Sequence, residues 1–229
     1  MSPTPKSLSE TLLSSNPEFN SMENFKRSMS SSMMGEELDL ISDPTIRSFV
    51  CAVLSRADPF WFSPASFVEG SHPPDEMKIK GLLLHTKRVV RTVQLLINTI
   101  ESSQSERDCV VAAAILHDVT KALWHRDEIT HDPMHMYTVN SFIEFCFEKD
   151  TQDADSSIDN VMDIDSENLL LILRLIRCSH GEFSPIPETI PITWLEHVIH
   201  MADLISSSLH MIIDGEDILE QRWNIVPIV

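Results

Sequence analysis

The sequence has no long apolar run, and its first residues lack the apolar core of a secretory signal. No stretch approaches the roughly 18 consecutive apolar residues that a membrane-spanning helix needs. Serine is frequent near the N-terminus, as in transit peptides, but Glu10, Glu18 and Glu23 argue against one because such peptides contain few acidic residues. We therefore expect an intracellular, cytoplasmic chain with no membrane partner.

Paired cysteines and positive charge are also scarce. The four cysteines are far apart in the sequence and form no CxxC pair, which excludes a disulfide framework and a thiolate zinc site. The formal net charge is −18, so binding to double-stranded nucleic acid is not expected, because that binding needs a cationic surface. A divalent cation, by contrast, suits an acidic chain.

The length of 229 residues suits one domain with additional segments. Residues 1–40 are rich in serine and methionine and have little periodicity, which predicts a flexible leader before a domain at 41–229. Within that domain, residues 148–167 read "EKDTQDADSSIDNVMDIDSE", an acidic run without a core pattern. We expect this run to be an exposed insertion.

Apolar residues recur at helical spacing over most of the domain, and strand signals are weak. A first helix is expected after Asp43, which suits an N-cap, with Pro44 at the first helical position. The segment "DCVVAAAILHDVTKALW" is apolar nearly all round and predicts a central, buried helix. These patterns predict an all-α helical bundle. Further helices are expected at about 77–100, 134–148, 167–178 and 193–213.

Ten histidines are many for a chain of this length, and several stand among apolar residues. Burying an ionisable group is costly unless it is paired or binds a metal. Imidazoles with carboxylates and no thiolate favour a catalytic divalent ion with open coordination positions over a closed structural site. The five places at which an ionisable side chain meets apolar sequence are His85, His117 with Asp118, His135, His180 and Asp203.

His85, the His117–Asp118 pair and Asp203 stand in the order H…HD…D, which resembles the signature of the HD-domain metal-dependent phosphohydrolases. "GLLLHTKRV" and "ILHDVTK" are similar to the first two motifs of that family, and the resemblance runs from about residue 58 to 209. "FSPASFVEGSHPPDE" resembles a variant in which a Pro-Ala-Ser loop and a histidine precede the first helix. That variant implies that Ser66 and His72 lie near the site, and we expect both to take part in binding substrate.

The resemblance implies that the four residues of the H…HD…D pattern hold one metal ion. We expect this ion to be Mn, Fe, Co or Ni, or else Mg. Members with a second ion use additional histidines, and His135 and His180 stand in suitable places. Many such members have a histidine pair where this chain has "SHG", so a second site would lack one ligand. His131 competes with His135, because "THDPMH" offers both.

The resemblance implies a metal-dependent phosphohydrolase that cleaves a phosphoester or phosphoanhydride bond of a nucleotide or small phosphorylated metabolite by a metal-activated water. Asp118 and Lys121 are the expected catalytic residues, and Lys121 is also expected to contact substrate phosphate, with Arg88 as a weaker candidate. A non-catalytic HD module that senses a nucleotide or binds a partner protein is the alternative. An oxygenase is a third possibility, because some di-iron proteins use a similar scaffold, although their ligand sets are usually fuller.

Overall fold

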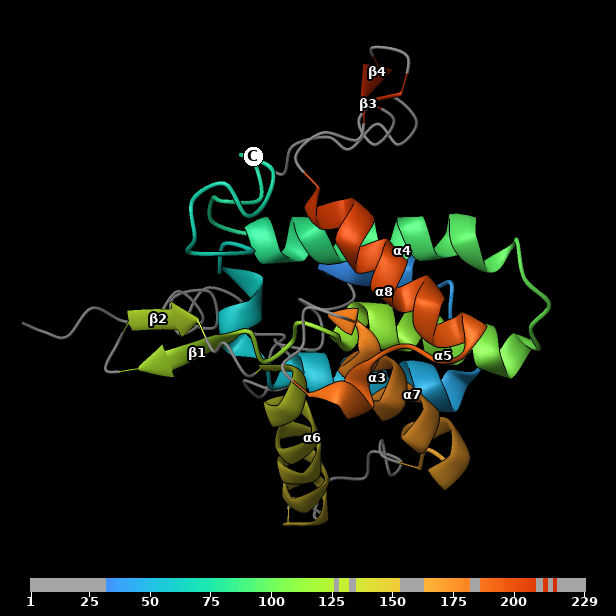
Figure 1. Ribbon diagram of the computed structural model, residues 1–229. Coiled ribbons are helices and arrows are strands. Elements are labelled where there is room, and N and C mark those ends of the chain that lie inside the picture. The colour runs from blue at the N-terminus through green and yellow to red at the C-terminus, as the bar shows by residue number, and fades with distance from the viewer. Residues whose placement is uncertain are drawn as a thin grey trace, which may run out of the picture.

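The computed structural model of the chain describes residues 32–125, 128–131, 135–152, 163–181, 186–208, 212–213 and 216–217. Helices form the body of this part of the chain, and short antiparallel hairpins lie at its edge (Figure 1). The predicted all-α class is therefore confirmed. The helices are α3 (Pro44–Ser55), η1 (Asp58–Trp61), α4 (Gly81–Ile97), α5 (Gln104–Leu116), α6 (His135–Gln152), α7 (Ser166–Cys178), η3 (Pro187–Thr189) and α8 (Trp194–Ser207).

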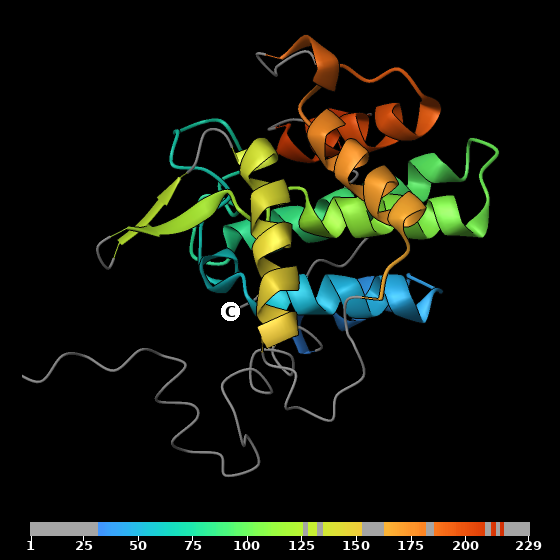
Figure 2. The same ribbon diagram turned by 90° about the horizontal axis from the view of Figure 1, so that it is seen from below.

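Helix α5 is the central element of the bundle. It contacts α3, α4, α7 and α8, and α8 also packs across α4 and α7 (Figures 1 and 2). Val110, Ala113 and Leu116 of α5 are buried, in agreement with a helix that is apolar nearly all round. A capping box between Ser103 and Glu106 fixes the start of α5. The helix can therefore present its C-terminal end to neighbours on several sides.

The start of α3 follows the prediction. The Asp43 side chain accepts hydrogen bonds from the backbone N–H groups of Thr45 at 2.7 Å and Ile46 at 3.2 Å, and Pro44 occupies the first turn.

The predicted end of the leader at residue 40 is wrong, because residues 32–38 form a helical segment that packs on the body. Met34 and Leu38 belong to the hydrophobic core, and Glu37 forms a 2.9 Å ion pair with Lys87 of α4. Apolar burial and this ion pair hold the segment in place although its sequence has little periodicity. The rest of the leader, residues 1–31, lies outside the described part of the chain.

The central helix is shorter than predicted. Helix α5 ends at Leu116, residues 117–120 form a turn, and the chain then enters β1 (Ala122–His125). This strand pairs with β2 (Glu128–His131) in an antiparallel hairpin. The expectation of a helix continuing to residue 124 is therefore wrong, whereas His117 and Asp118 do lie at the end of the central helix.

Three other predicted boundaries also move. Helix α4 begins at Gly81 rather than at residue 77, because Lys80 before it adopts a left-handed conformation with φ of 67°. Helix α8 ends at Ser207 rather than at residue 213. Helix α6 extends to Gln152, so the first residues of the predicted insertion 148–167 are helical, while residues 153–162 lie outside the described part.

Two predicted absences can be compared with the structure. Cys109, Cys146 and Cys178 are buried and Cys51 is half-buried, and these four residues, all in the described part of the chain, form no disulfide bond. Among the described residues, none of the helices combines the length and the apolar character needed to cross a bilayer.

Candidate metal centre

Three helices bring four ionisable side chains together inside the bundle. His85 comes from the second turn of α4, His117 and Asp118 follow the last turn of α5, and Asp203 comes from α8. The side chains of the first three are at most 1% exposed, and that of Asp203 is 13% exposed. The residues that carry the H…HD…D pattern therefore converge on one place in the core.

The nitrogen and oxygen atoms of this group lie within a few ångströms of one another. His85 Nε2 is 3.1 Å from Asp203 Oδ1 and 3.8 Å from Asp118 Oδ2. His117 Nε2 is 3.4 Å from Asp118 Oδ2 and 3.8 Å from Asp203 Oδ1. Ligands that share one ion at about 2.0–2.2 Å have similar separations from one another. The arrangement is therefore compact enough for a single divalent cation.

The tautomer of His117 supports a ligand role. Its Nδ1–H donates to the backbone carbonyl of Ala114 at 2.8 Å, which leaves the lone pair on Nε2. Nε2 is buried and has no aligned hydrogen bond among the described residues, although it faces two carboxylates. A buried acceptor directed at two further acceptors is unfavourable unless a cation lies between them, so these residues fit a metal ion.

A second group shares Asp118. His135, the first residue of α6, places Nε2 2.8 Å from Asp118 Oδ1, and the ring of His180 lies 4.9 Å from that of His135. Asp118, His135 and His180 each offer one ligand atom within 4.8 Å of the others. The structure thus places the two histidines of the predicted second site beside Asp118. The side chain of His131, the competing residue, lies outside the described part of the chain.

Electrostatics reinforce the charged state of the two aspartates. Burial alone would raise the pKa of Asp118, but Lys121, His117 and His135 outweigh it and hold the pKa well below its usual range. Burial would likewise raise the pKa of Asp203, but His85 and His117 outweigh it and lower that pKa below its usual range. Both carboxylates therefore remain available as anionic ligands.

The pKa values of His85 and His180 shift in opposite directions. Burial would lower the pKa of His85, but Glu76 and Asp203 raise it to about 9. Burial dominates at His180 and lowers its pKa to about 4, despite Asp203 and Asp118 nearby. His180 is therefore neutral at physiological pH, which is the form that binds metals.

Lys121 contacts the same carboxylate. Its ammonium lies 2.7 Å from Asp118 Oδ2, and its side chain is 8% exposed. Residues 117–120 form a turn, which carries the Lys121 backbone past Asp118 while allowing the side chain to return to it. A cation held at the edge of a metal centre suits the recognition of a phosphate group, as predicted from the sequence.

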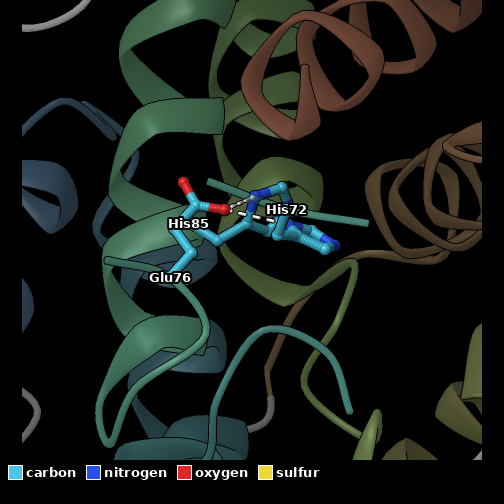
Figure 3. A group of neighbouring side chains, drawn as sticks. All are labelled: His72, Glu76 and His85. Atoms are coloured by element: carbon cyan, nitrogen blue, oxygen red, sulfur yellow. Dashed lines mark hydrogen bonds and ion pairs between the residues drawn. The ribbon is translucent and has the colours of Figure 1, made fainter. Parts of the chain in front are cut away.

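The loop before α4 adds a third group, which contains His72, Glu76 and His85 (Figure 3). The rings of His72 and His85 meet edge to face at a centroid distance of 4.7 Å, so the loop histidine does lie beside the centre. The buried carboxylate of Glu76 directs Oε2 at Nδ1 of both rings, at 2.9 Å from His72 and 3.2 Å from His85. Sequence analysis did not single out Glu76, because an acidic residue in a proline-rich loop is usually exposed. Its spacing of four residues from His72 was the available signal.

Arg88 and Ser66, both predicted to contact substrate, have other partners here. The Arg88 guanidinium forms 2.6 Å ion pairs with Asp75 and Glu76, so its charge is directed at two carboxylates. The Ser66 hydroxyl accepts a hydrogen bond from the backbone N–H of Val68 at 3.0 Å. These contacts argue for structural roles, and a direct role for either residue in substrate binding stays a prediction.

His200 of α8 supports the segment that carries His180. Its Nδ1–H donates to the Ser179 carbonyl at 2.9 Å, and its ring fills the space beside Gly181. Gly181 has φ of 49°, a conformation that glycine adopts more easily than other residues. The "SHG" sequence therefore has a local structural reason for its glycine: a side chain at residue 181 would overlap the His200 ring.

Comparisons with protein-family models, with curated proteins and with solved structures found no match to this chain. The molecule is therefore defined by its own features: a helical protein with buried groups of histidine, aspartate and glutamate that could bind a metal ion. This arrangement is compatible with an HD-type site.

Proposed function

We propose that the protein is an HD-type, divalent-metal-dependent phosphohydrolase that acts on a nucleotide or another small phosphorylated metabolite. One observation carries the proposal. His85, His117, Asp118 and Asp203 occur in the order of the HD signature, and their side chains meet in the core with Nε2–carboxylate distances of 3.1 to 3.8 Å. Burying carboxylates and imidazoles together is costly unless their charges are paired or bind a cation, which supports a metal ion among these residues.

In this proposal these four residues hold one ion, and Asp118 with His135 and His180 provides for a second. A bound divalent ion neutralises the oxygens of a phosphate group and activates water for attack on phosphorus. Lys121 binds a phosphate oxygen, and the surrounding helices limit the entry of bulk water. The donor set of imidazole and carboxylate favours Mn, Fe, Co or Ni. Mg, a hard cation that prefers oxygen ligands, is the alternative.

The acidity of the chain supports a small substrate. A formal net charge of −18 repels long polyanions, and a nuclease that follows a nucleic-acid strand would need a basic track. A single phosphate group needs only local positive charge, which an ion and Lys121 provide. The substrate we propose is therefore a nucleotide or a comparable metabolite, and no duplex nucleic acid is required.

The experiment is a hydrolysis screen with a matched variant. Phosphate or nucleoside release would be measured from NTPs, dNTPs, NMPs, cyclic nucleotides and dinucleotides with Mn²⁺ or Co²⁺, for wild type and Asp118→Asn. Asp108→Asn is the control, because Asp108 is a buried aspartate of α5 that accepts hydrogen bonds from the Asp43 backbone N–H at 2.7 Å and from Gln104 at 2.8 Å.

We expect metal-dependent turnover in wild type and in folded Asp108→Asn, and its loss in Asp118→Asn. Tight metal binding without turnover of any compound would overturn the hydrolase and favour a nucleotide sensor or a scaffold. Failure of wild type to bind Mn²⁺, Co²⁺ or Fe²⁺ would overturn the metal centre itself.

A further inference from the structure

Glu76 is a buried carboxylate whose oxygens all have partners. Oε2 accepts a hydrogen bond from His72 Nδ1 at 2.9 Å. It also lies 3.2 Å from His85 Nδ1, which is an ion-pair distance without an aligned hydrogen bond in the described part of the chain. Oε1 accepts a hydrogen bond from the Arg88 guanidinium at 2.6 Å. The two imidazoles therefore both face Oε2 of Glu76 with their Nδ1 atoms (Figure 3). The Arg88 guanidinium, which stays charged, holds Oε1.

The backbone holds Glu76 in this position. Its carbonyl accepts a hydrogen bond from the Ala65 N–H at 2.8 Å, which joins the two ends of the loop before α4. The same carbonyl packs so closely against Gly81, the first residue of α4, that any Cβ there would overlap it. Glu76 is thus fixed against the start of the helix that carries His85.

His72, Glu76 and His85 could be read as ligands of an ion of their own, since their atoms lie within 4.8 Å of one another. The Arg88 guanidinium argues against that interpretation, because it lies 2.6 Å from Glu76 and would repel a cation at this carboxylate. In addition, His85 already directs Nε2 toward Asp118 and Asp203. The remaining role for Glu76 is to act on His85 from the side opposite the metal centre.

We propose that Glu76 is a positioning residue of the metal centre: it keeps the proton of His85 on Nδ1 and so presents Nε2 to the ion. Histidine ligands generally donate their second ring N–H to a carboxylate or carbonyl, which fixes the tautomer and raises the basicity of the metal-binding nitrogen. His117 receives the same support from the Ala114 carbonyl. Arg88 and His72 keep Glu76 charged and in place. This inference rests on the proposed metal-dependent function.

The test compares Glu76→Gln with Asp75→Asn in Mn²⁺ binding. Glu76→Gln keeps the size of the side chain but removes the charge that faces His85. Asp75 is the other carboxylate partner of Arg88, and its side chain is 42% exposed. Asp75→Asn removes this charge and leaves the contact between Glu76 and His85 unchanged. The dissociation constant for Mn²⁺ would be measured by isothermal titration calorimetry, and circular dichroism would check that both variants are folded.

We expect Glu76→Gln to weaken Mn²⁺ binding by about 10- to 100-fold and Asp75→Asn to change it by less than about threefold. Wild-type affinity in folded Glu76→Gln would overturn the inference, and so would equal weakening in both variants, because the effect would then act through Arg88. If wild type itself binds no metal, the proposed function fails before Glu76 is tested.

A second measurement needs no variant and decides the case in which Glu76→Gln does not fold. Nitrogen-15 spectra of the imidazoles in Zn²⁺-loaded wild type identify which ring nitrogen is protonated and which is bound to metal. We expect His85 to show a protonated Nδ1 and a metal-bound Nε2. A metal-bound Nδ1 would overturn the role of Glu76.

Discussion

His135 Nε2 lies 2.8 Å from Asp118 Oδ1, while the second oxygen of the same carboxylate, Oδ2, faces His117 at 3.4 Å and Lys121 at 2.7 Å. Asp118 therefore belongs to two groups of candidate ligands at once. A carboxylate can bridge two ions in this way, whereas a neutral imidazole has one lone pair to offer. This sharing allows the two groups to be separated by mutation.

We expect His135→Ala to retain one tightly bound Mn²⁺ per chain and His117→Ala to retain none. His117 belongs to the group with His85 and Asp203, whereas His135 Nε2 faces the other oxygen of Asp118, in the group with His180. Metal content after dialysis, measured by mass spectrometry, checks this result. His197→Ala is the control, since His197 is an exposed residue of α8. Loss of all metal from folded His135→Ala would show that the two groups form one inseparable site.

Lys121→Ala should weaken phosphate binding without weakening metal binding. A hydrogen bond to a charged partner contributes about 1.5–3 kcal/mol, so the dissociation constant for inorganic phosphate should rise at least tenfold. Removing the ammonium 2.7 Å from Asp118 also relieves its competition with a cation, so Mn²⁺ affinity should stay the same or increase. Calorimetric titration of the metal-free protein with Mn²⁺ gives the metal affinity, and titration of the Mn²⁺-loaded protein with inorganic phosphate gives the phosphate affinity.

Lys87→Ala is the matched control for Lys121. Lys87 is in α4 close to His85, but its ammonium pairs with Glu37 at 2.9 Å. Phosphate affinity should therefore stay unchanged in Lys87→Ala. A comparable loss in both variants would contradict a specific role for Lys121.

Gly181→Ala should destabilise the fold by about 2–4 kcal/mol, from an unfavourable backbone angle and overlap with the His200 ring. The φ of Gly181 is 49°, and His200 cannot move aside without losing its hydrogen bond to the Ser179 carbonyl. Urea unfolding measures this change. Gly35→Ala is the control, because a Cβ at Gly35 meets nothing within 4 Å.

A double-mutant cycle separates the two costs at Gly181. In the His200→Ala background the overlap disappears, so Gly181→Ala should lose less stability than in wild type, with an interaction energy of about 1–3 kcal/mol. If the two changes were simply additive, the close approach of the His200 ring would not be the source of the cost.

Glu196→Gln should destabilise the protein at neutral pH but not in acid. Burial would raise the pKa of Glu196, but Arg174 at 2.8 Å and the backbone N–H groups of Ile192 and Thr193 lower it below its ordinary value of 4.5. A depressed pKa in the folded state adds stability above 4.5, and that stability is lost as the pH falls toward the folded-state pKa.

The free energy of unfolding at pH 7 should fall by about 1–2 kcal/mol in Glu196→Gln, because Gln has one acceptor oxygen in place of two and no charge facing Arg174. The difference from wild type should shrink as urea unfolding is repeated at pH values below 4.5. Glu188→Gln is a suitable control, because Glu188 is exposed. An equal deficit at all pH values would show that the charge of Glu196 is not responsible.

Local sequence signals predicted the elements that local interactions determine. Asp43 with Pro44 marked the start of α3, and the all-round apolar character of residues 108–116 indicated the buried helix that became α5. Periodicity did not reveal the hairpin of β1 and β2, because two four-residue strands are too short to distinguish from a helix by spacing. The segment at 32–38 was missed for a related reason, since only tertiary packing fixes it.

The candidate site shows the same division. Polar residues in apolar surroundings identified the pair at the end of α5, together with His85 and Asp203. Glu76 was missed because its burial depends on a loop that folds back onto α4, and no local sequence pattern predicts that contact. Arg88 was assigned toward substrate from its position three residues after His85, whereas its partners, Asp75 and Glu76, come from that same loop.

The pairing of His85 with Asp203 joins two residues 118 positions apart in the chain. During synthesis, a growing chain could complete α4 and α5 long before α8 has been made. The N-terminal ligands would then lack their last carboxylate, so a nascent or prematurely terminated chain holds an incomplete centre. Under the proposed function, the metal centre would be complete only after α8, the last helix in the described part of the chain, has docked.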